Sequence, residues 1–164
     1  MTEGCHIAQI NGGRLVAPRG DPGVQPFFDA LDRVNALADA SPGFVWRLQD
    51  EGGNATAIQV TPDPLFILNM SVWTDPDALF AFVYRSAHTR EMARRREYFA
   101  PFEGAYQALW WVPAGHVPVL LAGKPFGSPP DVTIRSQVPW PVAHQAVLIA
   151  LGAVWLVAAV LNAR

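Results

Sequence analysis

The sequence predicts an α+β domain in which helices cover one face of a single antiparallel sheet. One observation behind this is composition. Apolar residues make up 51% of the 164 residues and charged residues 16%, which excludes a disordered chain and allows a substantial core. A second is periodicity, because segments typical of strands alternate with two segments of helical spacing in the order β-α-β-β-β-α-β. A third is the Gly- and Pro-rich turn signals between these segments.

The first strand and the first helix open the domain. Residues 5–10 alternate loosely and predict a strand, which the turn signal Asn-Gly-Gly at residues 11–13 should end. Residues 25–40 predict an amphipathic helix, stopped by Ser-Pro-Gly at residues 41–43. The apolar positions of this helix recur every three or four residues, at Phe28, Leu31, Val34 and Leu37.

Four more strands are expected after this helix. Residues 44–49 and 55–60 read as two strands around the turn at residues 50–54. Residues 66–73 give the strongest strand signal in the chain, and residues 106–112 predict the last strand.

A second helix is predicted over residues 76–99, with a break near Ser86. Its start carries a typical signature, because Thr74 can cap the helix, a proline is tolerated in the first turn, and Asp77 follows three residues after the cap. The basic stretch on this helix, with Glu91 four residues before Arg95, is read as a solvated face.

We therefore expect one domain over residues 1–122, followed by a Pro-rich linker and an apolar C-terminal segment over residues 123–164. Residues 146–161 are uninterruptedly apolar but fall short of the roughly 20 residues that a spanning helix needs. This run is interpreted as a helix docked on the domain or on a partner, as a marginal membrane anchor, or as a non-native tail. Membrane contact through it is left open but not favoured.

Charge and cysteine content exclude several classes. Twelve basic and fourteen acidic residues give a net charge of −2, so we expect no nucleic-acid partner. The single cysteine, Cys5, excludes a disulfide framework and a cysteine-based metal cluster. No signal peptide is visible at the N-terminus, so a cytoplasmic protein is expected. The histidines show no metal-ligand spacing, and no phosphate loop or nucleophile elbow occurs.

The strand at residues 66–73 is apolar on both faces and must be covered twice. If both helices pack on one face, the sheet of a second copy is the simplest cover for the other, so we predict a homodimer. Alternation places Phe66, Leu68, Met70 and Val72 on one face, and Ile67, Asn69, Ser71 and Trp73 on the other.

Three polar-tipped side chains, Asn69, Ser71 and Trp73, follow one another on a face that is otherwise apolar. Buried amides and hydroxyls need hydrogen-bond partners. The functional interpretation is a small-molecule pocket, with the amide and the indole N–H donating to a ligand oxygen. The structural interpretation is that they bond to neighbouring backbone and to the second helix.

Further candidates come from the second helix and from the strand ends. Phe80, Tyr84 and His88 recur every four residues and are expected to share one helix face, where His88 is either a general base, a metal or haem ligand, or a structural histidine. His6 and His116 flank the first and last strands and are candidates for closing the pocket.

Five short motifs resemble a bacterial family of unknown function that is similar to the antibiotic-biosynthesis monooxygenases of the dimeric α+β barrel superfamily. The resemblance covers about residues 5–120 and implies a ferredoxin-like fold whose sheets pair across a dimer. The motifs are HIAQIN (6–11), GFVWRL (43–48), NMSVW (69–73), FVYRSAH (82–88) and WWVPAGH (110–116).

The resemblance also implies site residues. In the cofactor-independent monooxygenases of this superfamily, a strand Asn and a Trp four residues later bind and activate a phenolic substrate, and Asn69 and Trp73 match that spacing. Tyr84 and His88 are the nearest equivalents of catalytic groups on the following helix. The residues expected to bind substrate are His6, Trp46, Ser71, Phe80, Arg85, Trp111 and His116.

The leading hypothesis is a small tailoring enzyme of specialised metabolism, a monooxygenase-like oxidoreductase or else an isomerase or cyclase, that acts on an aromatic or polyketide-like molecule in an apolar pocket. The substrate itself would supply electrons to O₂, so no cofactor is expected. A second hypothesis is haem binding with His88 as the axial ligand. A third is a non-catalytic module for small-molecule binding or assembly.

Overall fold

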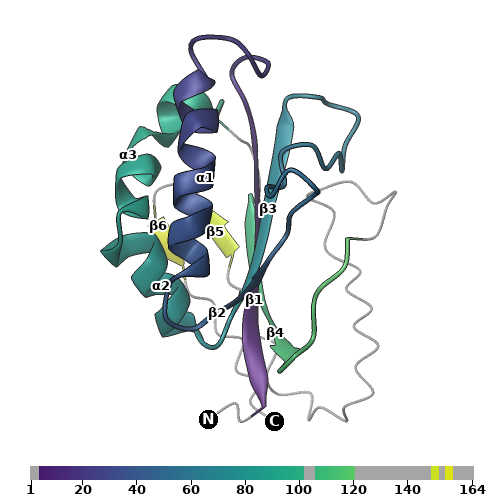
Figure 1. The fold of residues 1–164 in the computed structure, drawn as a ribbon, viewed down its shortest axis with the longest axis vertical. Helices are drawn as coiled ribbons and strands as arrows, with labels where there is room; N and C mark the ends of the chain where they lie inside the picture. Colours follow the sequence, from purple (N-terminus) through teal and green to yellow (C-terminus); the bar gives the residue numbers. More distant parts are fainter. Residues whose placement is uncertain (1–3, 102–105, 121–148, 152–153, 157–164) are drawn as a thin grey trace.

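The computed structural model describes residues 4–101, 106–120, 149–151 and 154–156. Figure 1 shows the helices together on one side of an antiparallel sheet, as the α+β prediction requires. The sheet contains β1 (Cys5–Arg14), β2 (Phe44–Arg47), β3 (Phe66–Trp73) and β4 (Gln107–Pro113). The helices are α1 (Gln25–Asp39), α2 (Pro76–Arg85) and α3 (His88–Tyr98). Two short strands, β5 (Ile149–Leu151) and β6 (Val154–Leu156), pair with each other.

The strand order is β2-β3-β1-β4, with β1 antiparallel to both β3 and β4 and β3 antiparallel to β2. This order, with one helix between β1 and β2 and the α2–α3 pair between β3 and β4, is that of a ferredoxin-like fold. The predicted fold class is confirmed.

Residues that pair across strands share a face of the sheet. On the face that α1 and α2 cover, the register makes three rows across β3, β1 and β4, each about 5 Å from strand to strand. The rows are Trp73–Ile7–Trp111, Ser71–Gln9–Leu109 and Asn69–Asn11–Gln107.

Apolar packing closes one end of this face. Trp73 is fully buried and packs with Ala38 of α1 and Leu79 of α2, and Phe44, Phe82 and Trp111 pack around this cluster. The helices are therefore held to the sheet at the row of Trp73.

The opposite face carries a second cluster formed by Ala8, Val72 and Val112, against which Trp46 and Trp110 pack. Met70 and Val72 are at most 2% exposed within the single chain. Trp46 and Trp110 on the same face are half-buried, and the dimer stays a prediction.

Several element boundaries differ from the prediction. β1 does not end at Ile10 but continues through Gly12 and Gly13, which pair with Leu68 and Ile67 of β3. Ladder pairing thus overrides a local turn signal. Gly13 also allows the ring of Phe99 to lie on the strand, since a Cβ there would stand 2.7 Å from Phe99 Cδ1.

Residues 55–60 are not a strand, contrary to expectation. Asn54 Oδ1 accepts hydrogen bonds from both the backbone N–H and the hydroxyl of Thr56, and the Ile58 N–H bonds to the carbonyl of Ala55. These local bonds hold the segment in turns.

The second predicted helix divides at Ser86, as expected, into α2 and α3. The Ser86 hydroxyl donates to the carbonyl of Phe82 and accepts from the N–H of His88, so one side chain serves both helix ends. The cap of α2 is Asp75 and not Thr74. The Asp75 carboxylate accepts from the N–H of Ala78, and this bond, with that from the Thr74 hydroxyl, lowers the pKa of Asp75.

Most of the apolar run at residues 146–161, with the linker before it, lies outside the described residues. Its described parts are the strands β5 and β6 rather than a helix. Among the described helices, none combines the length and the apolar character needed to cross a bilayer.

Candidate functional site

A group of uncharged polar side chains lies on the helix-covered face of the sheet. We call Gln9, Asn11, Asn69, Ser71 and Gln107 the polar strip. They come from three neighbouring strands and occupy two adjacent rows of the register. The local sequences produce this because polar residues stand at alternate positions of β1 and β3, and alternate side chains point to the same face.

Hydrogen bonds connect four of the strip residues through Gln9. The Gln9 amide Nε2 donates to Ser71 Oγ at 3.1 Å, and Gln9 Oε1 accepts from Asn11 Nδ2 at 3.3 Å and from Gln107 Nε2 at 3.4 Å. Ser71 Oγ also accepts the indole N–H of Trp73 at 2.9 Å. The network therefore fixes the orientation of each amide that it contains.

Exposure increases along the strip from one end to the other. Trp73 is fully buried, Gln9 and Ser71 are 5% and 6% exposed, and Asn11 and Gln107 are half-buried. Asn69 is exposed, and its amide makes no hydrogen bond to another described residue. β2 ends at Arg47, opposite Ser71, so no strand partner flanks Asn69 on that side. The strip thus runs from the core to an open end at Asn69.

Aromatic side chains border the strip at its buried end. The ring of Trp73 contacts Phe44 edge-on with the centroids 5.4 Å apart and stacks on Phe82 at 5.0 Å. Phe82 in turn lies 4.8 Å from the ring of His88. At the other end, the ring of Phe99 covers Gly13, two residues beyond Asn11 on the same face of β1.

His88 begins α3 and is half-buried, with its ring against that of Phe82. Its Nδ1 lies 3.4 Å from the carbonyl oxygen of Val83, so Nδ1 carries the proton and donates it there. Burial lowers the pKa of His88 below its ordinary value, although the Val83 carbonyl and the charge of Glu91 act in the opposite direction. The imidazole is therefore neutral at pH 7, and its Nε2 can accept a proton or bind a metal.

The indole N–H of Trp73 was expected to donate to a ligand, but in the structure it donates to Ser71, a residue of the polar strip. The Trp73 side chain is fully buried. Asn69 and Ser71 share its face, as predicted, and Trp111 lies in the same row as Trp73.

Phe80, Tyr84 and His88 do not share one helix face, because the chain leaves the helical conformation at Ser86. Phe80 and Tyr84 remain neighbours, with ring centroids 6.1 Å apart, while His88 turns toward Phe82. Tyr84 is 42% exposed, and partial burial, together with nearby Tyr106, raises the pKa of its phenol.

Three other predicted residues are not brought to the polar strip. His6 and Trp46 pair with Val112 and Val72 and so lie on the opposite face of the sheet. His116 is exposed in the segment after β4. Within one chain, these three side chains are therefore not part of the site on the helix-covered face.

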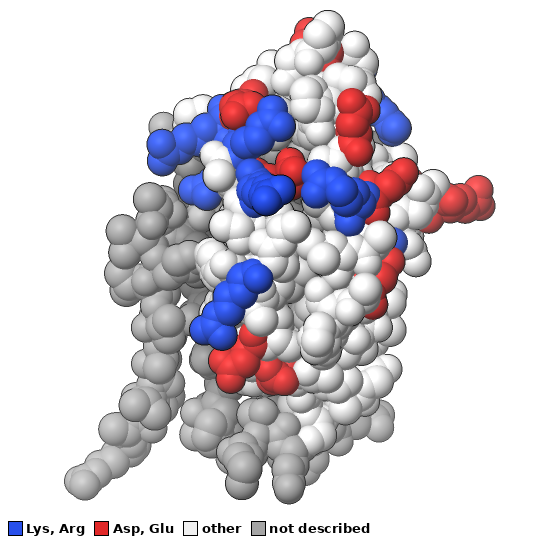
Figure 2. Space-filling view, turned by 60° about the vertical axis from the view of Figure 1, so that its left-hand side comes forward, with Lys and Arg blue, Asp and Glu red and all other residues white. Residues whose placement is uncertain are grey.

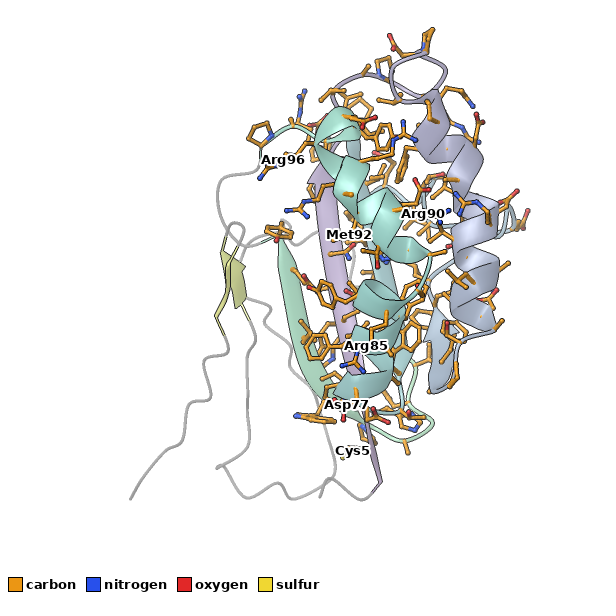
Figure 3. All side chains as sticks on the ribbon, turned by 90° about the vertical axis from the view of Figure 1, so that its left-hand side faces the viewer. Cys5, Asp77, Arg85, Arg90, Met92 and Arg96 are labelled. Atoms are coloured by element: carbon orange, nitrogen blue, oxygen red, sulfur yellow. The ribbon has the colours of Figure 1, made fainter. Side chains whose placement is uncertain are left out.

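Arg85 lines a separate open hollow of about 570 Å³ between the turn at residues 41–43 and α2. Asp75 and Asp77 border the same hollow, and Figure 3 shows Asp77 and Arg85 on α2 at this end of the molecule. The Asp75 carboxylate is already engaged as the helix cap. This hollow is a feature of the capped helix end, and we place the candidate site at the polar strip.

The arginines of α3 lie on the surface among acidic side chains (Figure 2). Arg94 pairs with Glu97, and Glu91 pairs with Arg33 of α1 at 2.8 Å rather than with Arg95 as expected. The mixed charge agrees with a solvated face.

Within the described residues, no three side chains of His, Cys, Asp or Glu come together as metal ligands. A haem would depend on His88 Nε2 as its protein ligand, which the Nδ1 bond to Val83 leaves available.

Gln9, Asn11 and Gln107 were not among the site residues predicted from the sequence. A signal existed in the alternation of Gln9 and Asn11 with apolar residues in the first strand. Recognising it required the register between strands far apart in the chain, which places Asn11 beside Asn69 and Gln107.

Comparisons with known proteins give a family and several similar structures, among them the following two. A protein of unknown function from Nitrosomonas europaea, NE2512, is 13% identical with a TM-score of 0.45, over 73% of this chain and 98% of that chain. SnoaB, a cofactor-independent oxygenase from Streptomyces nogalater, is 16% identical with a TM-score of 0.43, over 68% of this chain and 95% of that chain. Similarities at this level carry no conclusion about activity.

No protein with a curated description matches the chain. The family model described as "Domain of unknown function (DUF3291)" matches residues 6–124, which is most of the chain and contains the whole polar strip. The chain therefore belongs to the DUF3291 family.

Proposed function

We propose that this protein is a small-molecule enzyme that oxidises an aromatic or polyketide-like substrate with O₂ and without a resident cofactor. The observation that carries the proposal is the exposed amide of Asn69, which bonds to no other described residue, at the open end of an uncharged polar strip whose other end is buried. An amide in this position can donate to a substrate oxygen, while the aromatic rings at the two ends of the strip suit a planar apolar body.

The reaction would convert an activated CH₂ group between aromatic rings into a carbonyl. Loss of a proton gives an enolate, whose negative oxygen the Asn69 N–H stabilises. The enolate gives electrons to O₂, and a carbon–oxygen bond forms. One oxygen atom stays on the carbon as the carbonyl, and the other leaves as water with the two hydrogens that the carbon lost. The substrate is the reductant and O₂ the oxidant.

Neutral His88 is the residue proposed to take the proton, because its lowered pKa leaves Nε2 unprotonated at pH 7. Its Nδ1 bond to Val83 fixes the tautomer, and its contact with Phe82 links it to the Trp73 cluster. Trp73 and Ser71 are proposed to hold the strip in place through the hydrogen bonds from Trp73 to Ser71 and from Gln9 to Ser71.

The test is oxidation of dithranol, a dihydroxyanthrone, followed by the visible absorbance of the anthraquinone under air and under argon. We expect turnover above the uncatalysed rate under air only. Asn69→Ala should lower kcat about 100-fold, the usual cost of removing an oxyanion donor. His88→Gln should lower it as well, while Gln59→Ala, at an exposed residue that does not belong to the strip, should match the wild type.

Unchanged turnover in Asn69→Ala would remove that residue from the mechanism. If dithranol is not oxidised but added haem gives a Soret band that His88→Ala abolishes, the protein is a haem binder instead. If neither occurs, the third hypothesis, a non-catalytic binding module, takes its place.

A further inference from the structure

The outer row of the polar strip presents three carboxamides side by side. Asn11 of β1 pairs with Asn69 of β3 on one side and with Gln107 of β4 on the other. The three side chains therefore lie next to one another across the three strands. Neighbouring side chains in such a row lie about 5 Å apart. The row therefore offers amide groups at regular intervals along one edge of the candidate site.

Gln9 sets which atoms of this row face a ligand. Its Oε1 accepts one N–H from Asn11 and one from Gln107, and its own Nε2 is held by Ser71. Asn11 and Gln107 each keep a carbonyl oxygen and one N–H for another partner. Because Gln9 is 5% exposed and lies behind the row, it acts on a ligand only through its neighbours.

The charges on this face narrow the ligand class. The strip itself is uncharged, and Arg47, the cation closest to it in the register, is ion-paired with Asp39 and also donates to the carbonyl of Gly53. A carboxylate or phosphate would find no free cation on the strip. Hydroxyl and carbonyl oxygens, by contrast, can use both the donors and the acceptors of amides.

We propose that the row of Asn69, Asn11 and Gln107 reads the oxygen pattern of a neutral, planar aromatic ligand, with Gln9 as the positioning residue. The favoured ligand carries hydroxyl or carbonyl oxygens on alternate ring carbons, whose separation is similar to the spacing between neighbouring strands. The inference rests on the proposed function for the aromatic nature of the ligand and adds the groups that select it.

Binding of anthraquinones, which carry no CH₂ group for the proposed oxidation, tests this without turnover. Xanthopurpurin has two hydroxyl groups on alternate carbons, alizarin has them on adjacent carbons, and anthraquinone has none. We expect the full chain to bind xanthopurpurin more tightly than either of the others, measured as Kd by quenching of tryptophan fluorescence.

Asn11→Ala and Gln107→Ala should each weaken xanthopurpurin binding about 2- to 10-fold, the range of one hydrogen bond, and leave anthraquinone binding unchanged. Gln9→Met keeps the shape of the side chain and should reduce the preference for xanthopurpurin, because both amides lose the group that orients them. Gln59→Ala is the matched control at an exposed glutamine.

A uniform loss of affinity for all three quinones would show a merely structural effect and overturn the proposal. So would an unchanged preference in Asn11→Ala and Gln107→Ala, or no binding of xanthopurpurin. If the preferences appear but dithranol is not oxidised, the oxidation fails while the recognition stands. If dithranol is oxidised without any preference, the recognition fails alone.

Discussion

Removing the Ser71 hydroxyl tests the internal network of the site. Ser71 Oγ accepts hydrogen bonds from two donors that have little access to water, Trp73 Nε1 at 2.9 Å and Gln9 Nε2 at 3.1 Å. Trp73 is fully buried and Gln9 is 5% exposed, so neither donor can turn to solvent. Ser71→Ala therefore leaves both donors without a partner while it removes only one oxygen atom.

The expected cost follows from these two donors. An unsatisfied buried donor costs about 1–3 kcal/mol, and two such donors would cost about 2–6 kcal/mol. We expect about 3 kcal/mol, because the vacated space lets the side chains relax. For a domain of this size such a loss lowers Tm by roughly 10 °C.

Urea denaturation followed by tryptophan fluorescence measures this loss, with the slope m unchanged. Ser41→Ala is the matched control. The Ser41 hydroxyl donates to the carbonyl of Leu37 and accepts no hydrogen bond from a buried donor among the described residues. Its removal therefore leaves no donor without a partner and should lower the free energy of unfolding by less than about 1 kcal/mol. Equal losses in the two variants, or a loss below about 0.5 kcal/mol in Ser71→Ala, would refute the network as described.

Three further predictions concern the rest of the domain. Gly43→Ala should lower the free energy of unfolding by about 3 kcal/mol in urea titrations, since φ is +78° and a Cβ would lie 2.5 Å from Ala78 Cβ; a loss under about 1 kcal/mol would contradict the packing. Burial lowers the pKa of His88, so the unfolded chain binds a proton that the folded chain does not. Stability should then fall as pH drops below about 6.5, and an equally steep fall in His88→Gln would contradict this. Light scattering after gel filtration should show a homodimer, which would cover the half-buried Trp46 and Trp110 on the second face of the sheet; a monomer at micromolar concentration would refute the dimer.

Local signals predicted the elements whose own sequences decide them. The periodicity of residues 25–40 gave α1 to within one residue, and Gly43, with its positive φ, marks the turn that ends it. The two-fold alternation of β3 correctly placed Asn69, Ser71 and Trp73 on one face. The break at Ser86 was also expected, and the structure shows its hydroxyl bonding to backbone groups of both helix ends.

The remaining features depend on contacts between segments far apart in the chain. Gly12 and Gly13 look like a turn locally, yet pairing with β3 on one side and the Phe99 ring over Gly13 keep them in a strand. Likewise, nothing near Gln9 in the chain shows that Ser71, Asn11 and Gln107 converge on it. The pairing register between strands determines both the length of β1 and the set of side chains around Gln9, and this register cannot be read from one sequence alone.

The measurement that most directly tests the location of the site is an NMR titration of the full chain with xanthopurpurin, observed at the side-chain amides. We expect the amide signals of Asn11, Asn69 and Gln107 to shift together and saturate at one ligand concentration, while that of exposed Gln59 stays in place. Shifts confined to the hollow around Gly43 and Arg85, with the strip amides unchanged, would contradict it.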